Sequence, residues 1–410
     1  MMKFEDNLKK YAKLIVEVGV NIQKEQYLMI RTPIEGAYFA REIAKSAYEA
    51  GAKKVFVEYN DEQLTKITYS YASDEALGEY PAWIAQGYTE LAEKDTAFIS
   101  ISAGDPDLLK DIPPNKISIA QKAAGKALET YRRYISNSDV PWCVVSIPTL
   151  PWSKKIFPEV SAEKGMELLW DKIFQVTRIY EQDPVEAWKN HTDLLAQKCS
   201  FLNSKKIKTL HYKAPGTDLT VELPDKHIWL GGGEHTTKGT YFVANMPTEE
   251  VFTMPYKYGV EGILSSTKPL NFGGNLIEDF TLTFEKGKIV ACSAKKGYEM
   301  LKQLIDTDEG SHYLGEVAIV PHSSPVSASN TIFFNTLFDE NASCHFAIGN
   351  SYPINIENGT QMSKEELEKV GANTSITHED FMVGGAEMTI EATTEQGEVF
   401  CILKEGEWAF

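Results

Sequence analysis

The stretch that decides the fold is QYLMIRTPIEGAYFAREIAKSAYEAGAKKVFVEY, residues 26–59. It starts with a short apolar run at 26–31, continues with an amphipathic segment at 36–50, and closes with a second apolar run at 54–59. The two runs predict strands, and the segment between them predicts a helix that ends at Gly51. Strand, helix, glycine and strand over this length are typical of a right-handed βαβ unit.

The same alternation extends along the first half of the chain. An amphipathic helix is predicted over 4–19, and helices around 82–93 and 117–134 precede apolar strands at 96–101 and 142–147. Alternating strands and helices predict an α/β layer with a mainly parallel sheet. The dinucleotide motif GxGxxG does not follow the first strand, and the phosphate-binding motif GxxxxGK[ST] does not occur. Nucleotide binding is therefore not expected.

From about Lys205 the pattern changes to short apolar runs separated by Gly, Pro, Asn and Asp. We therefore predict an α/β N-terminal domain at 1–204, followed by an α+β catalytic domain at 205–410 that is rich in antiparallel strands. A helical segment over 163–203 connects the two. The second domain is predicted to contain strands at 208–212, 218–223, 240–243, 280–285 and 288–293, a tight hairpin at 285–288, and helices at 296–306 and 363–370, the last capped by Ser363.

Length and charge limit the possible partners. A chain of 410 residues is long for a single hydrophobic core, which agrees with two domains. The formal charge is 41 − 58 = −17, and most of the excess acidity falls in residues 201–410. Such a charge argues against duplex nucleic acid and against an anionic membrane surface as partners. No apolar run is long enough to span a bilayer.

The five cysteines are widely spaced and form no CxxC pair. An odd number of scattered cysteines is typical of reduced thiols rather than of a disulfide framework. The N-terminal residues are polar and lack the apolar core of a signal peptide. We therefore expect a cytoplasmic protein.

Charged side chains recur between Glu316 and Asp380 in apolar, strand-like surroundings. Glu316 precedes VAIV, His345 precedes FAIG, and Asp380 precedes FMVGG. An ionised side chain in such surroundings costs roughly several kcal/mol unless it is paired or bound to a metal. Several such groups together indicate a metal site.

Each residue of this cluster also has a simpler interpretation. In a strand, His378 and Asp380 would share one face, which suits Zn²⁺, Co²⁺ or Mn²⁺ better than Ca²⁺, but H-x-D is also compatible with a surface ion pair. Glu316 could be a sheet carboxylate that accepts backbone hydrogen bonds. His345, five residues after Glu340, could be a core histidine.

The Glu249-Glu250 pair, which precedes an apolar run, could be the exposed start of a strand or helix. Considered together, however, four carboxylates and two imidazoles could hold two divalent ions about 3.5–4 Å apart, with one bridging carboxylate. Such a site favours hydrolysis of an amide or ester.

Four segments carry a resemblance to a known family: NMPTEEVFTMP (245–255), LGEVAIVPHSSPVS (314–327), FFNTLFDENASCHFAIGNSYP (333–353) and THEDFMVGG (377–385). They resemble the metallo-aminopeptidases that include aminopeptidases T, II and S. The resemblance extends to GVNIQKEQYLMIRTP (19–33) and covers nearly the whole chain.

This resemblance implies a set of site residues and cofactors. Glu316 is implied as the carboxylate shared between two divalent ions, which are zinc or cobalt, with manganese or magnesium as alternatives. Tyr352 is implied either as a further ligand or as a donor to the tetrahedral intermediate. Glu316, Tyr352 and Glu340 are the expected catalytic residues. The implied metal ligands are Glu250, Glu316, Glu340, His345, His378 and Asp380.

The resemblance also implies the activity. It predicts a homodimeric, metal-dependent aminopeptidase that removes single N-terminal residues from peptides, using a water activated by two metals. Binding of the free α-amine by a metal or a nearby carboxylate would explain exopeptidase action. The general base stays open between Glu249, Glu340 and Glu379, because a base needs an oxygen free of the metals.

Other functions remain as alternatives. A two-metal hydrolase acting on phosphoesters or cyclic amides is one alternative. A phosphoester substrate is disfavoured, because no basic cluster lies near the motifs. A non-catalytic peptide-binding protein with a structural metal site is a second alternative. A serine hydrolase is disfavoured because no GxSxG motif occurs.

Overall fold

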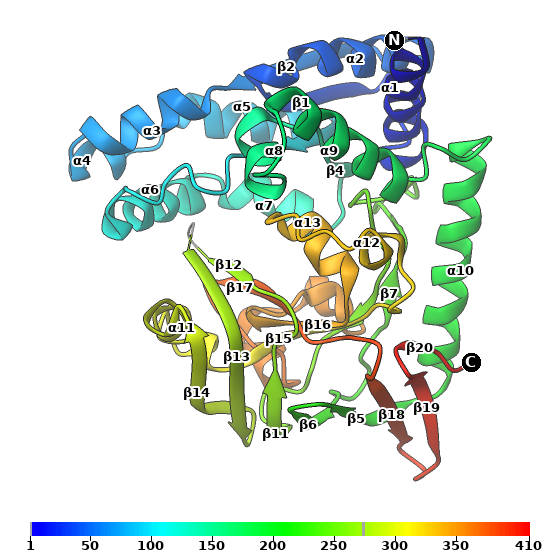
Figure 1. The fold of residues 1–410 in the computed structure, drawn as a ribbon. Coiled ribbons are helices and arrows are strands. Elements are labelled where there is room, and N and C mark those ends of the chain that lie inside the picture. Colours follow the sequence, from blue (N-terminus) through cyan, green and yellow to red (C-terminus); the bar gives the residue numbers. More distant parts are fainter. Residues whose placement is uncertain (1, 273–274) are drawn as a thin grey trace. The chain divides into compact units, whose positions relative to one another are not determined.

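The computed structural model of the protein describes residues 2–272 and 275–410 (Figure 1). The chain forms two compact units. The first runs to Asn190 and takes up the chain again at Gly233–Pro247, and the second consists of His191–Gly232 and Thr248–Phe410. The chain therefore passes between the units three times.

The first unit is built on a four-stranded parallel sheet, which confirms the predicted α/β architecture. Its strands lie in the order β2-β1-β3-β4, and every pair is parallel. Strand β1 pairs with β2 on one side and β3 on the other, so the βαβ unit predicted from residues 26–59 forms one end of the sheet, with β1 inside it and β2 at the edge. The strands are β1 (Tyr27–Pro33), β2 (Lys54–Asn60), β3 (Ala97–Ser102) and β4 (Trp142–Ser146).

Helix α2 (Ala37–Glu49) shows why the connecting segments are helical. Its buried residues Phe39, Ala40, Ile43 and Ala47 recur at helical spacing. Gly51 follows the helix at φ +100°, a conformation that favours glycine. The other helices of this part of the chain are α1 (Met2–Leu14), α3 (Glu62–Tyr71), α4 (Asp74–Leu77), α5 (Ala82–Glu93), α6 (Pro114–Ala127), α7 (Glu129–Ser136), α8 (Leu150–Ile156), α9 (Ala162–Val176) and α10 (Pro184–Ser204).

Two predicted helices differ in detail from the structure. The helix predicted over 117–134 is two helices, α6 and α7, which are separated at Leu128. The helical segment predicted over 163–203 is likewise divided into α9 and α10. Within the described residues, no helix combines the length and apolarity required to cross a membrane.

The second unit contains a large antiparallel sheet, as predicted. Its path runs β12-β13-β11-β6-β5-β18-β19-β20, with β14 paired to β13. Lys286 and Gly287, both at positive φ, form the predicted hairpin between β13 and β14. The strands are β5 (Ile207–Ala214), β6 (Thr217–Glu222), β11 (Val260–Ser265), β12 (Leu270–Phe272), β13 (Asn275–Glu285), β14 (Lys288–Lys296), β18 (Thr389–Thr394), β19 (Val399–Lys404) and β20 (Glu407–Trp408).

A second, five-stranded antiparallel sheet lies in the same unit, in the order β17-β16-β15-β10-β7. Every residue of β15 and β16 is buried. Val317, Phe346 and Phe381 from one face of this sheet belong to the hydrophobic core of the unit. The strands are β7 (Leu230–Gly231), β10 (Val251–Thr253), β15 (Leu314–Ile319), β16 (His345–Gly349) and β17 (His378–Met382).

Short helices complete this unit: α11 (Tyr298–Ile305), α12 (Pro325–Ala328), α13 (Thr336–Asp339) and α14 (Lys364–Lys369). Ser363 caps α14 in a capping box with Glu366, as its position predicted. The strand predicted at 240–243 is the short β9 (Tyr241–Phe242), which pairs with β8 (Glu234–His235) within the first unit.

Candidate metal centre

Four of the predicted site residues lie on one face of the five-stranded sheet. Glu316 of β15 is paired with Ala347 of β16, which in turn is paired with Asp380 of β17. Paired residues of antiparallel strands point to the same face, and so do residues two apart on one strand. His345 and His378 therefore share this face with Glu316 and Asp380.

Glu250 reaches the same place from an earlier part of the chain. It directly precedes β10, whose Phe252 is paired with Ala318 of β15. Positions 250 and 252 share a face, as do 316 and 318, so strand pairing places Glu250 on the same face of the sheet as Glu316. The two carboxylates reach Nε2 of His345 from opposite sides along the strands. Both carboxylates are buried, at 7% and 5% exposed.

The side-chain atoms of these five residues lie close together. Nε2 of His345 is 2.9 Å from Oε2 of Glu250 and 3.7 Å from Oε1 of Glu316. Nε2 of His378 is 3.3 Å from Oε2 of Glu316 and 3.5 Å from Oδ1 of Asp380. The residues thus form two triads, Glu250–Glu316–His345 and Glu316–His378–Asp380, which share Glu316.

The two triads fit divalent metal ions. Oε2 of Glu250 and Oδ1 of Asp380 are buried, and each faces an imidazole Nε2, so a lone pair of an oxygen and one of a nitrogen converge at each triad. Histidine nitrogen and carboxylate oxygen bind Zn²⁺ at about 2.0–2.2 Å, so two ligand atoms of a tetrahedral ion lie roughly 3.3 Å apart. The separations of 2.9, 3.7, 3.3 and 3.5 Å bracket that value.

Backbone carbonyls orient both imidazoles. Nδ1 of His345 lies 3.0 Å from the carbonyl oxygen of Ser343, and Nδ1 of His378 lies 2.7 Å from that of Asn350. A carbonyl oxygen only accepts, so each Nδ1 carries the proton and donates. Each Nε2 is then directed at the carboxylates, in the arrangement usual for metal-binding histidines.

Charge in the centre is distributed unequally between Glu316 and Glu250. Burial by itself raises the pKa of Glu316, but His345 and His378 outweigh burial and hold that pKa at about 2. Burial also raises the pKa of Glu250, and the single imidazole of His345 does not compensate, so this pKa stays above its ordinary value. Glu316 is therefore the carboxylate most strongly held in its charged form.

The neighbouring carboxylates raise the pKa values of both imidazoles. Burial lowers the pKa of His345, but Glu250 and Glu316 together raise it well above the ordinary value. Burial likewise lowers the pKa of His378, but the charges of Asp380 and Glu316 outweigh burial and raise this pKa well above its ordinary value. The carboxylates thus favour a positive charge beside them, either on an imidazole or on a bound ion.

Glu340 lies near this centre, but among the described residues it belongs to neither triad. It begins a 3-10 helix, Glu340–Ala342, and its Oε1 accepts a hydrogen bond of 3.3 Å from Nδ2 of Asn341. Burial, followed by the charges of Glu250 and Asp380, raises the pKa of Glu340 well above its ordinary value. Glu340 is therefore within electrostatic reach of the triads.

Tyr352 lies beside His378, with the two ring centroids 4.6 Å apart. Burial is the main reason that the pKa of its phenol is raised, and Glu316, Asp380 and Glu340 raise it further. The hydroxyl therefore keeps its proton at neutral pH and can donate a hydrogen bond.

The two other carboxylates considered as general bases are placed differently. Oε2 of Glu249 lies 3.5 Å from Nε2 of His191, and its backbone N–H donates to Oδ1 of Asn341. Glu379 is paired with Ile348, so it lies on the opposite face of β17 from His378 and Asp380. Neither belongs to a triad among the described residues.

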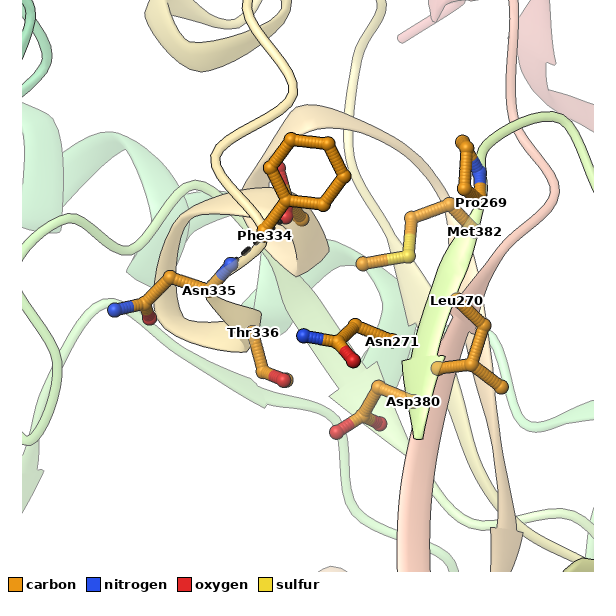
Figure 2. A pocket seen from close by; sticks show the side chains of 9 residues that line it. Pro269, Leu270, Asn271, Phe334, Asn335, Thr336, Asp380 and Met382 are labelled. Atoms are coloured by element: carbon orange, nitrogen blue, oxygen red, sulfur yellow. Dashed lines mark hydrogen bonds between the residues drawn. The ribbon is translucent and has the colours of Figure 1, made fainter. Parts of the chain in front are cut away.

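A pocket beside Asp380 was not found from the sequence. Its walls include Leu270 and Asn271 of β12, Phe334, and Met382 of β17 (Figure 2). Met382 and Phe334 lie inside the segments that carry the family resemblance, so the motifs did point to this neighbourhood. No sequence signal indicated Leu270 or Asn271, because β12 and β17 belong to different sheets and only tertiary packing places them together.

A hydrolytic metalloenzyme is the class that this fold and this donor set define. Comparison with known proteins identifies the family. Residues 4–408 match the family described as thermophilic metalloprotease (M29), and the chain belongs to that peptidase family.

Named relatives agree with this assignment. Aminopeptidase AmpS of Bacillus subtilis is 53% identical over 410 residues, covering 100% of both chains. Aminopeptidase 2 of Geobacillus stearothermophilus is 51% identical, covering 100% of this chain and 99% of its own. The solved structure of wild-type AmpT from Thermus thermophilus is 38% identical, with a TM-score of 0.94 over 99% of this chain and 100% of that one.

The predicted family and enzyme class are therefore confirmed. The chain is an aminopeptidase of a metalloprotease family, a hydrolase that acts on peptides and requires a divalent metal.

Proposed function

We propose that this chain removes single N-terminal residues from peptides with two divalent ions that share Glu316. Glu250 and His345 would complete one ion site, and His378 and Asp380 the other. The observation that carries the proposal is the pair of triads, in which opposite oxygens of Glu316 face different imidazoles. When bound, the ions supply the positive charge that acidifies a water and polarises the scissile carbonyl.

Tyr352 would stabilise the oxyanion. Its raised pKa keeps the phenol protonated, and its packing against His378 holds it at the edge of the centre. A hydroxyl that donates only to the developing negative charge stabilises the transition state more than the bound substrate. Tyr352 is thus proposed as a hydrogen-bond donor rather than as a ligand.

Glu340 would act as the general base. It lies outside both triads, so a carboxylate oxygen stays free of the proposed ions, and it is within electrostatic reach of Glu250 and Asp380. In this role an oxygen of Glu340 accepts the proton of the attacking water and passes it to the leaving amine. That Glu340 is also a sixth ligand stays a prediction.

The acidic surroundings would select substrates with a free N-terminus. Four carboxylates, those of Glu250, Glu316, Glu340 and Asp380, influence one another in this centre. With the ions bound, a free α-amine offers a lone pair to an ion or an N–H donor to a nearby carboxylate, whereas acylation of a blocked terminus withdraws that lone pair.

Further properties are part of the same proposal. Histidine with carboxylate donors favours zinc or cobalt over calcium. The five free cysteines are consistent with a cytoplasmic protein. All triad residues lie after position 205, which supports 205–410 as the catalytic domain and 1–204 as the N-terminal domain. The homodimer rests on the family resemblance.

The test is hydrolysis of leucine p-nitroanilide. We expect a chelator to abolish it and added zinc or cobalt to restore it, whereas N-acetyl-leucine p-nitroanilide should not be cleaved. Activity that survives complete metal removal, or equal cleavage of the blocked substrate, would overturn the proposal.

Glu340→Gln separates the two roles considered for Glu340. As a base, it should leave the metal content of the purified protein unchanged while kcat falls by about 100-fold or more. If metal is lost together with activity, Glu340 is a ligand. Glu379→Gln is the matched control, since that carboxylate lies on the other face of β17.

A further inference from the structure

A pocket lined in part by Asp380 lies within the second unit. Its volume is about 370 Å³, including the part that is open to solvent. Figure 2 shows the side chains of Asn271, Met382 and Asp380 extending toward the segment that carries Phe334 and Thr336. The pocket therefore has strands on one side and a loop with the start of α13 on the other.

The loop wall of the pocket is held in an unusual conformation. Phe334 has φ +54°, a left-handed conformation that costs about 1–3 kcal/mol for a residue other than glycine. Asp339 maintains it, because its carboxylate accepts hydrogen bonds from the N–H groups of Phe333 at 2.8 Å and Asn335 at 3.1 Å. Strain maintained in this way is typical of sites that hold a ligand.

The position of the pocket limits what can enter it. In an aminopeptidase, the first residue of the substrate has its α-amine and its scissile carbonyl at the metal centre. Its side chain leaves from the carbon between these two groups, so it projects within a few bonds of the ligands. Asp380 belongs both to the Glu316–His378–Asp380 triad and to the pocket wall.

We propose that this pocket binds the side chain of the N-terminal residue of the peptide, and that Met382 and Phe334 set its size. The proposal rests on the function proposed above. Leu270 and Met382, each 4% exposed, provide an apolar floor, and Asn271 and Thr336 provide a neutral polar rim. None of the described residues that line the pocket is basic, so it offers no partner to an acidic side chain. The pocket thus suits neutral, mainly apolar first residues of medium size.

Two substitutions of Met382 test the pocket in opposite directions. Met382→Ala enlarges the pocket. The ratio of kcat/KM for phenylalanyl p-nitroanilide to kcat/KM for leucyl p-nitroanilide should therefore rise about 10-fold, which is within the discrimination that one methylene group gives in an apolar pocket. Met382→Phe fills the pocket, so kcat/KM for leucyl relative to alanyl p-nitroanilide should fall by at least about 10-fold.

Met388→Ala is the matched control, because Met388 is 1% exposed and belongs to the core of the same unit. The Met388→Ala substitution removes the same side-chain atoms as Met382→Ala, but from a buried site outside the pocket. It should lower stability as Met382→Ala does, yet leave both substrate ratios within about 2-fold of the wild type.

Dipeptide series identify which substrate residue enters the pocket. With X-Ala and Ala-X substrates, the Met382 variants should change the preference only for the first residue. A change confined to the second residue, or unchanged ratios in both Met382 variants, overturns the proposal. Wild-type protein that cleaves none of these substrates would instead refute the proposed function, so the two failures are distinguishable.

Discussion

The two triads of the candidate metal centre are built from the same sheet but are supported differently. His345 lies on β16, between β15 and β17, and its side chain is 1% exposed. His378 begins β17, which ends the strand order of that sheet, and its side chain is 18% exposed. We call these the inner triad, Glu250–Glu316–His345, and the edge triad, Glu316–His378–Asp380.

The difference concerns what holds each imidazole in place. The inner triad is fixed by ladder hydrogen bonds on both sides of β16, in a fully buried strand. In the edge triad, His378 and Asp380 lie on β17, which pairs with β16 on one side only in the strand order of this sheet. A strand held on both sides and fully buried changes shape less readily than a partly exposed edge strand. The inner triad should therefore bind its ion more tightly, and the edge triad should exchange its ion faster.

The largest effect is expected at the residue that both triads share. Glu316→Gln removes the charge that both imidazoles face, so both ions and all measurable activity should be lost together. Metal analysis of the dialysed protein and hydrolysis of leucine p-nitroanilide check this. Full metal content with full activity would rule out a shared role for Glu316.

A direct comparison of the two triads uses one histidine from each. His378→Ala should lower metal content from two ions to one, whereas His345→Ala should lower both metal content and thermal stability, because it also leaves Glu250 buried without its partner. Activity should fall by more than about 100-fold in both variants. Equal losses of metal and of stability in the two would contradict the distinction between the triads.

Removal of the Tyr352 hydroxyl is expected to give the next largest loss of activity. Tyr352→Phe keeps the ring against His378 but removes the donor, so kcat should fall by about 10²–10³-fold while KM stays nearly unchanged. Metal content should not change. Loss of metal from this variant would indicate a ligand role for Tyr352 instead.

A smaller effect is expected at Asp308, which supports the edge triad from a distance. Its carboxylate accepts hydrogen bonds from Ile376 N–H at 2.7 Å and from Ser375 Oγ at 2.8 Å, just before β17 begins. Asp308→Asn should weaken binding of the edge ion by about 10-fold or less and leave the inner ion in place. Titration with a metal-sensitive dye would check both sites.

Asp308 also predicts a dependence of stability on pH. Burial opposes the charged form of Asp308, but hydrogen bonds from Ile376, Ser375 and Ser311 outweigh burial and lower its pKa. A lowered carboxyl pKa adds stability above the ordinary carboxyl pKa, and that stability is lost as pH falls through the lowered value. In chelator-treated protein, the Tm of Asp308→Asn should be below the wild-type Tm near pH 7, and the difference should vanish in acid.

The local pattern of the sequence predicted much of the fold. The parallel sheet followed from alternating apolar runs and amphipathic segments, and the hairpin at 285–288 followed from its glycine. The breaks at Leu128 and between α9 and α10 were missed, because helical periodicity continues across them. Nothing in the composition of residues 233–247 marks them as part of the first unit, since that assignment depends on contacts distant in sequence.

For the centre, the sequence by itself determined the donor types and the pairing of His378 with Asp380, because a strand places alternate residues on one face. It also placed Glu316, His345 and Glu250 in apolar surroundings, where charge requires compensation. Only the tertiary structure decided which donors meet. The pairing of β10 with β15 places Glu250 on the face that carries Glu316, and His345 of β16 lies within reach of both. The physical reason is that the register between strands is a long-range property, which no local spacing encodes.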